Sequence, residues 1–154
     1  PTRHHSSAAS DVYKRQGDFC SLANARSITV AEDINRRYKS LDKLESLGNI
    51  DLRISGCMNS CGHHHIGNIG ILGVDKDGKA FYQLLLGGNS GEKGKASLGK
   101  IIAKAFAEDE ISDAVENILQ HYLSKRDKNE TFRSTVARLG NASFAEAANK
   151  ARKS

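Results

Sequence analysis

Apolar residues recur at steps of three or four along residues 20–38, which is the repeat of an amphipathic helix with one buried face. The pattern drifts on through Leu41 and Leu44 and stops at Gly48, a residue type that suits the end of a helix. The sequence therefore predicts an amphipathic helix of about five turns near the start, with a looser continuation.

Alternation with a period of two appears further along the chain. Residues 52–55 are predicted to form a short strand, residues 66–74 a β-branched strand interrupted by glycines, and residues 79–86 a second long strand. The intervening Asp-Lys-Asp-Gly at residues 75–78 is typical of a tight turn, so the two long strands should form a hairpin.

Two glycine-rich stretches leave alternatives open. Gly67, Gly70 and Gly73 remove bulk from one side of the first hairpin strand, which favours either a flat ligand or a close backbone segment there, or simply tight sheet packing. Residues 87–94 and Lys95 form a polar loop that could cradle acidic groups through its N–H groups, or could be a flexible connection.

Helical repeats return in the last third of the chain. Apolar positions predict helices over residues 97–106 and 111–123, each with one buried stripe, and a shorter helix over residues 129–139. The Ser143-x-x-Glu146 spacing is a capping box that would open a last, alanine-rich helix. The predicted class is α+β: a small, mostly antiparallel sheet covered by helices on one side, with a helical carboxy-terminal part.

Composition excludes several classes of protein. The 154 residues, 38% hydrophobic and 27% charged, are enough for one domain with its own core, and they contain no apolar run of the ~18 residues that a membrane helix needs. The net charge of +5 is mild, and basic residues are scattered along the predicted helices. We therefore expect neither a membrane nor a nucleic acid as partner.

Residues 1–16 differ in character from the rest of the chain. Their serine-, alanine- and histidine-rich opening has no periodic pattern and no apolar face, which is typical of a disordered arm. Residues 10–16 also resemble an adapter that bulk sequencing leaves at the ends of translated frames. We expect a non-native arm over residues 1–16 and native sequence over residues 17–154.

Three cysteines carry the candidate chemistry: Cys20, Cys57 and Cys61. Cys57 and Cys61 lie four apart in a predicted helical turn, which would put both thiols on one face with Cβ atoms about 5–6 Å apart. Cys20 precedes the first helix, so it can meet them at one end of the sheet. Three cysteines in this pattern indicate a reduced, cytoplasmic protein with a metal or cluster site and not a disulfide framework.

The residues alone leave the metal open. A [4Fe–4S] cluster takes four thiolates, whereas zinc takes four sulfur or nitrogen ligands and could be completed by His63, His64 or His65. On this chemistry the cluster and zinc are nearly level, and three free cysteines without a cofactor are a further alternative.

The surroundings of these thiols closely resemble the assimilatory nitrite and sulfite reductases. The resemblance is carried by Arg53-Ile-Ser-Gly-Cys57-Met-Asn-Ser-Cys61-Gly, by the glycine-rich hairpin after it and by Leu-Leu-Leu-Gly-Gly at residues 84–88. In that family a C-x5-C pair and a C-x3-C pair, about forty residues apart, bind a [4Fe–4S] cluster next to sirohaem. The separation of Cys20 from Cys57 fits, and the resemblance runs from about residue 17 to residue 132 or beyond.

One ligand of the family's pattern is missing. The first cysteine of C-x5-C would stand at Lys14, inside the expected adapter arm. We therefore expect that the gene was truncated between the first two ligands and that the chain is the carboxy-terminal piece of an enzyme roughly three times longer. The family's amino-terminal half, whose arginines and lysines hold the anion, would then be absent.

The resemblance implies a role for each site residue. Cys61 matches the cysteine whose thiolate bridges a cluster iron to the sirohaem iron, whereas Cys57 and Cys20 match ligands of the cluster alone. Asn59 is expected to help position the turn, and His63 stands where some members carry an arginine near the haem carboxylates. The implied activity is six-electron reduction of sulfite to sulfide or nitrite to ammonia, with electrons from ferredoxin or a flavoprotein.

Two other functions stay open at this point. A zinc-stapled binding module would contain zinc without iron or sulfide. A small iron–sulfur electron carrier without haem would need a fourth thiolate, and the chain has three cysteines.

Overall fold

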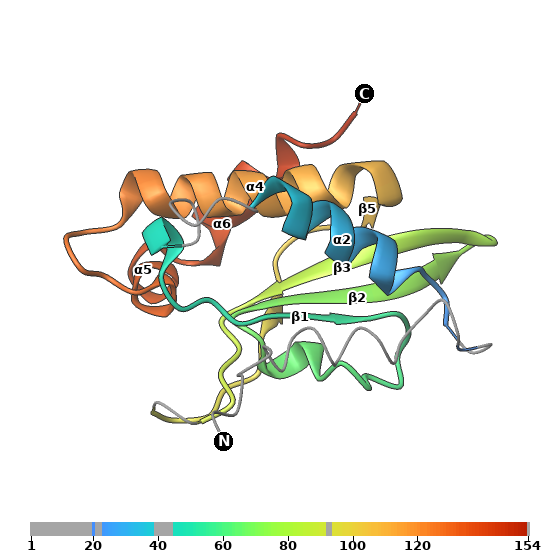
Figure 1. Ribbon diagram of the computed structural model, residues 1–154, viewed down its shortest axis with the longest axis horizontal. Coiled ribbons are helices and arrows are strands. Elements are labelled where there is room, and N and C mark those ends of the chain that lie inside the picture. Colours follow the sequence, from blue (N-terminus) through green and yellow to red (C-terminus); the bar gives the residue numbers. More distant parts are fainter. Residues whose placement is uncertain (1–19, 21–22, 39–44, 92–93, 154) are drawn as a thin grey trace, which may run out of the picture.

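The computed structural model describes residues 20, 23–38, 45–91 and 94–153. The sheet lies in the middle of the molecule, with the long helices on one side and the segment that joins β1 to β2 on the other (Figure 1). The predicted α+β class with a small, mostly antiparallel sheet is confirmed. The predicted arm over residues 1–16 and the continuation through Leu41 and Leu44 lie outside the described residues.

Two long strands form the centre of the sheet. β2 (Ile69–Lys76) and β3 (Lys79–Leu86) pair antiparallel along their whole length, with Ile69 opposite Leu86. Asp77 and Gly78 turn the chain with φ values of 55° and 76°, the conformation that an Asp-Gly hairpin favours. The predicted hairpin is confirmed.

Shorter strands complete the sheet on both sides of the hairpin. β1 (Leu52–Ser55) runs parallel to β2. β4 (Lys100–Ile101) and β5 (Phe106–Ala107) pair antiparallel with opposite ends of β3. The order is therefore β1-β2-β3-β4, with β5 also on β3.

The predicted helix over residues 97–106 is wrong. Two of its apolar positions face solvent, since Leu98 is 68% exposed and Ile101 is 55% exposed. The open edge of β3 explains the difference, because backbone groups here bond to that strand and not to one another; the Ile102 N–H donates to the Leu84 carbonyl at 3.0 Å. A local repeat of apolar residues does not reveal such an edge.

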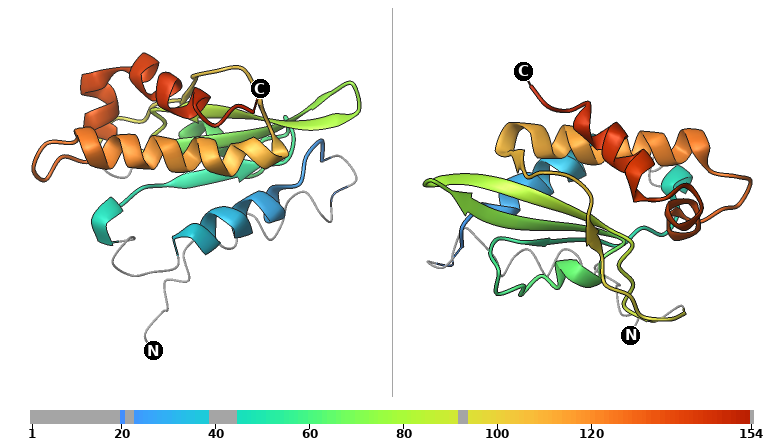
Figure 2. Two further views of the ribbon diagram at one scale, coloured as in Figure 1. Left: turned by 90° about the horizontal axis from the view of Figure 1, so that it is seen from above. Right: turned by 180° about the vertical axis from the view of Figure 1, so that it is seen from behind.

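The helices lie in one layer over the sheet. α4 (Glu108–Lys125) crosses it, flanked by α2 (Ser27–Arg37) on one side and α6 (Asn141–Asn149) on the other, as the rotated views show (Figure 2). α5 (Phe132–Leu139) packs between the ends of α4 and α6, and its first turn is capped by the Thr131 hydroxyl.

Several helix starts differ from the prediction. α5 begins at Phe132, three residues later than predicted. α2 begins at Ser27 and not near Cys20, because the N–H groups of residues 24 and 25 donate to another segment of the chain and not within a helix. α6 begins at Asn141, so Ser143 lies inside the helix; its hydroxyl lies 2.8 Å from Nε2 of His121 on α4.

The core lies between the sheet and α4. The predicted inward stripe of α4 is confirmed, since its apolar residues Ile111, Ala114, Val115, Ile118, Leu119 and Tyr122 are buried. They pack in one cluster with apolar side chains of the sheet and of the other helices, among them Tyr82, Leu84, Phe106, Phe132 and Phe144. Burial of these side chains is the main source of stability.

Replacing Ile118 by alanine should therefore destabilise the fold strongly. Ile118 is 0% exposed, so the change removes buried methyl groups and leaves a cavity, and we expect the free energy of unfolding to fall by about 2–5 kcal/mol. Urea unfolding followed by circular dichroism measures it. Gln120→Ala, at an exposed position of the same helix, is the matched control and should change little. Equal effects of the two variants would contradict the assigned core.

Candidate metal centre

Cys57 and Cys61 lie in a turn and not on the predicted helix. The chain leaves β1 at Ser55, and the Ser60 N–H then donates to the Cys57 carbonyl at 3.2 Å and the His63 N–H to the Ser60 carbonyl at 2.7 Å. Ser60 and His63 have left-handed φ values of 57° and 53°, which interrupts any helix. The two thiols are therefore not placed by helix geometry, and no helix dipole acts on them.

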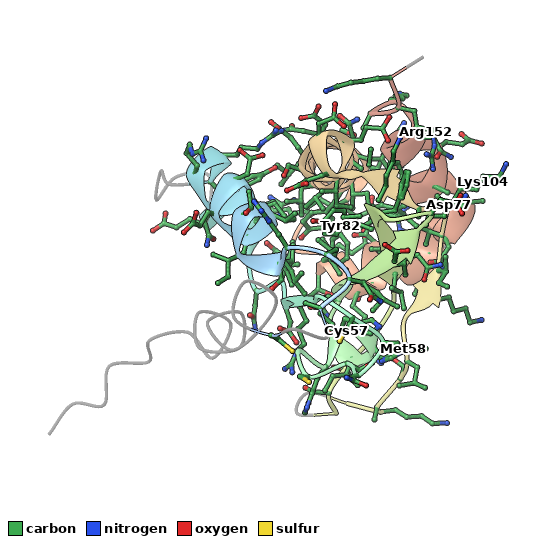
Figure 3. The ribbon with its side chains drawn as sticks, turned by 90° about the vertical axis from the view of Figure 1, so that its right-hand side faces the viewer. Cys57, Met58, Asp77, Tyr82, Lys104 and Arg152 are labelled. Carbon is green, nitrogen blue, oxygen red and sulfur yellow. The ribbon has the colours of Figure 1, made fainter. Side chains whose placement is uncertain are left out.

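The two thiols of this turn differ in exposure. Cys57 is buried, with 9% of its surface exposed, whereas Cys61 is exposed and its Sγ lies 3.9 Å from the Asn59 carbonyl oxygen. Figure 3 shows Cys57 and the neighbouring Met58 at the end of the molecule away from Lys104. One thiol of the turn is thus buried, and the other is presented to the outside.

Cys20 precedes a segment that bonds to this turn. The Cys20 carbonyl accepts the Ala23 N–H at 3.0 Å, and the N–H groups of Asn24 and Ala25 then donate to the Gly56 carbonyl at 2.9 and 3.1 Å. Gly56 is the residue before Cys57, so the chain after Cys20 is tied directly to the start of the cysteine turn. The Cys20 thiol is exposed.

Among the described residues the three thiols are not grouped as a site for a metal ion, and their convergence on one cluster stays a prediction. Over residues 20, 23–38, 45–91 and 94–153, no three Cys, His, Asp or Glu side chains are grouped so that they could hold a metal ion. All three cysteines are free thiols, which is the form in which cysteine binds iron or zinc after losing its proton.

The three consecutive histidines have different environments. His63 is exposed, whereas His64 is fully buried, with Nδ1 2.9 Å from the Ser55 hydroxyl. The His64 ring lies against that of His65, with 3.8 Å between centroids and a tilt of 34°. Burial, and secondarily the charge of His65, lowers the pKa of His64 to about 4. His64 is therefore neutral near pH 7 and committed to a bond inside the fold.

Two glycines let the turn lie directly on the strands. A Cβ at Gly62 would overlap the carbonyl oxygen of Ile54 in β1, and a Cβ at Gly70 in β2 would overlap the carbonyl oxygen of His64. The same is true at Gly73, whose neighbours are Ala25 and the Gly56 carbonyl. Gly70 and Gly73 are three residues apart in β2 and so face opposite sides of the strand, not the one side expected; at both positions the chain's own backbone approaches closely.

The polar loop after β3 also packs against this region. Asn89 and Ser97 form an isolated antiparallel bridge, and a Cβ at Gly88 would overlap the backbone of the segment between His65 and Gly67. The loop is thus joined to the fold at these residues, and close backbone packing explains why position 88 is a glycine.

Sequence reasoning missed two residues that hold the site together. Ser55, at the end of β1, bonds His64 across the turn. Asn68 accepts the Asp51 N–H at its Oδ1 and donates from Nδ2 to the Gly88 carbonyl, both at 3.0 Å, so it joins the start of β1 to the loop after β3. Ser55 lies inside the segment that carries the family resemblance and Asn68 follows that segment, but no pattern in the sequence marks either as a hydrogen-bonding residue.

No helix in the described ranges has the length and apolarity to span a bilayer.

The chain belongs to the family described as "Nitrite and sulphite reductase 4Fe-4S domain", whose pattern matches residues 50–154. This match includes β1, the cysteine turn, the hairpin and all helices from α4 onward, and it confirms the resemblance drawn from the sequence.

Individual relatives are similar over most of this chain. A ferredoxin–nitrite reductase of Leptolyngbya laminosa is 32% identical over 114 residues, 71% of this chain and 22% of that protein. A sulfite reductase [ferredoxin] 1 of Mycolicibacterium paratuberculosis is 30% identical over 132 residues, 79% and 23% of the two proteins. A cobalt-factor III methyltransferase of Priestia megaterium is 31% identical over 124 residues, 80% and 22%. The chain thus spans less than a quarter of the length of each.

The solved structure of the Mycobacterium tuberculosis NirA protein has the same arrangement. It superposes with a TM-score of 0.63 at 25% sequence identity, covering 81% of this chain and 24% of NirA. The likeness confirms the α+β fold of the described residues.

Burial of His64 predicts a pH-dependent stability. From its ordinary pKa of 6.5 down to about 4, the unfolded chain takes up a proton that folded His64 does not, so the free energy of unfolding should fall as pH falls through this window. Above pH 6.5 this contribution should be constant. Thermal unfolding at several pH values measures it.

The comparison with His64→Asn isolates this contribution from other titrations, because the variant has no imidazole at position 64. We expect the wild-type chain to lose more stability than His64→Asn between pH 6.5 and pH 4. His63→Asn, at an exposed site whose left-handed conformation asparagine tolerates, should keep the wild-type slope. Parallel curves for wild type and His64→Asn would contradict the buried neutral imidazole.

Proposed function

We propose that this chain supplies part of the cofactor site of a reductase that converts sulfite to sulfide or nitrite to ammonia. The observation that carries the proposal is the cysteine turn itself, with thiols at Cys57 and Cys61, in a chain that belongs to the nitrite and sulphite reductase family. Cys20, tied through residues 24 and 25 to Gly56, is proposed as a further ligand.

The donor atoms fit a [4Fe–4S] cluster as an incomplete set. Such a cluster takes four thiolates, and the chain has three cysteines, all free. We propose that Cys20, Cys57 and Cys61 would hold three irons and that Cys61 would also ligate the iron of sirohaem. When bound, the cluster would pass on electrons from the donor and the sirohaem would provide the iron at which the anion is reduced.

The environments of the thiols support different roles for them. Cys57 is buried, so it would hold the buried side of the cluster. Cys61 is exposed, as the proposed shared ligand must be if it contacts two groups. Asn59 and His63 are exposed in the same turn, and we propose that they contact the haem side. His64, by contrast, is buried and bonded to Ser55, so it is a poor zinc ligand.

Ferredoxin, or a flavoprotein, is the proposed electron donor, because relatives of this chain are named as ferredoxin-linked nitrite and sulfite reductases. Free thiols are needed for cluster binding, which is why we propose the reducing cytoplasm as location. Methyl transfer is a second candidate activity for the whole protein, because one relative is named as a cobalt-factor III methyltransferase. The family description and the reductase relatives favour reduction over methyl transfer.

The 154-residue chain should bind a cluster poorly and reduce neither anion on its own. It has three of the four thiolates, and residues 56–67 of the turn contribute no Arg or Lys that could stabilise charge on a reacting anion. Anaerobic reconstitution with iron and sulfide, followed by iron and sulfide analysis and by assays with reduced methyl viologen, tests this.

Extending the chain with an upstream half that carries the missing cysteine should restore a stoichiometric cluster and activity. In that longer protein, Cys61→Ser should abolish the coupling of cluster and haem seen by electron paramagnetic resonance, whereas Lys128→Ala, at an exposed residue before α5, should not. Zinc without iron or sulfide would identify a zinc module. Anion reduction by the 154-residue chain above a Cys61→Ser control would show that the active site is misassigned.

A further inference from the structure

The cysteine turn is closed by a pair of buried polar side chains. His64 is 0% exposed and Ser55 is 1% exposed, and the 2.9 Å contact between Nδ1 and the hydroxyl joins them. His64 Nε2 has no hydrogen-bond partner among the described residues. Burying an imidazole is costly unless it is bonded, so the single bond to Ser55 is what stabilises this placement.

This bond spans the segment that carries both thiols. Ser55 is the last residue of β1 and stands two residues before Cys57, and His64 lies three residues after Cys61 at the start of η1 (His64–Ile66). Between them the chain is a loop without helix or strand, so its conformation is not fixed by a ladder of backbone bonds. A side-chain bond between the two ends restricts the loop directly.

The histidine end of this pair is itself fixed. A Cβ at Gly70 would overlap the His64 carbonyl oxygen, so β2 is in direct contact with that backbone. The neighbouring His65 carbonyl accepts the Gly99 N–H at 2.7 Å, which ties η1 to the segment before β4. Contacts with the sheet therefore fix both ends of the turn. Ser55 belongs to β1 at the start of the turn, and His64 lies against β2 at its end.

We propose that His64 is a positioning residue for the Cys57 and Cys61 thiols, acting through its bond to Ser55. The bond keeps Cys57 buried while Cys61 stays exposed. This inference rests on the proposed function in one respect, because it concerns thiols that we assign as ligands. The restraint on the thiols can nevertheless be measured without any cofactor.

Alkylation of the metal-free 154-residue chain tests the proposal. Iodoacetamide labelling of Cys57 and Cys61, resolved by mass spectrometry of peptides, should be slower at Cys57 in the wild type because that thiol is buried. His64→Leu and Ser55→Ala should each raise the Cys57 rate about fivefold or more relative to Cys61, as expected when a buried hydrogen bond opposing local opening is lost. The double variant should add little to either single change.

Two controls separate this role from general destabilisation. His64→Asn puts an amide where Nδ1 lies and should keep the wild-type ratio of the two rates. His121→Leu removes a matched His–Ser pair, with Nε2 2.8 Å from the Ser143 hydroxyl on another part of the fold, and should leave the ratio unchanged. If His64→Leu does not fold, Ser55→Ala, which removes one atom, gives the same test.

The outcomes are distinct from those of the proposed function. An unchanged ratio in folded His64→Leu or Ser55→Ala, or an equal rise in His121→Leu, overturns the positioning role even if the longer protein binds its cluster. A selective rise with rescue by His64→Asn supports it even if no cluster forms. In the longer protein, the same two variants should broaden the cluster's electron paramagnetic resonance signal, whereas His64→Asn should retain it.

Discussion

The segment from Gly56 to Gly67 lies on β1 and β2 at backbone contact distance, and the candidate site depends on this close approach. It is possible because positions such as Gly62 and Gly70 carry no side chain where a Cβ would meet a carbonyl oxygen of the opposing segment. The sheet, and not the loop itself, then sets where the turn lies. In the turn placed in this way, Cys61 is exposed and Cys57 is buried.

The two sides of the sheet are stabilised by different interactions. Toward α4 the contacts are apolar, with large side chains such as Tyr82 and Phe106 fully buried, and they provide the free energy of folding. Toward the cysteine turn the contacts are polar and specific, namely the Ser55–His64 bond and the two bonds of Asn68. Substitutions on the second side should therefore alter thiol geometry at a smaller cost in global stability than substitutions on the first.

Membership of the reductase family places the three cysteines in the context of a larger protein. The chain spans less than a quarter of the length of the relatives it matches, and its cysteines are one short of a cluster's four thiolates. The described residues carry these three free thiols and have a core of their own under α4. A similar stretch also occurs in a protein named as a methyltransferase, so related chains are found in proteins named for different reactions.

Local sequence determined the features that rest on local physics. The β2–β3 hairpin is set by alternation and an Asp-Gly turn, the stripe of α4 by its helical repeat, and the family by the C-x3-C segment with its flanks. Tertiary structure alone decided the strands at residues 100–107, because the unpaired edge of β3 competes with helix formation there. Tertiary structure also decided how exposed each thiol is and that His64 is buried. Both depend on how closely the turn packs on distant backbone at the glycines, and no local pattern encodes that packing.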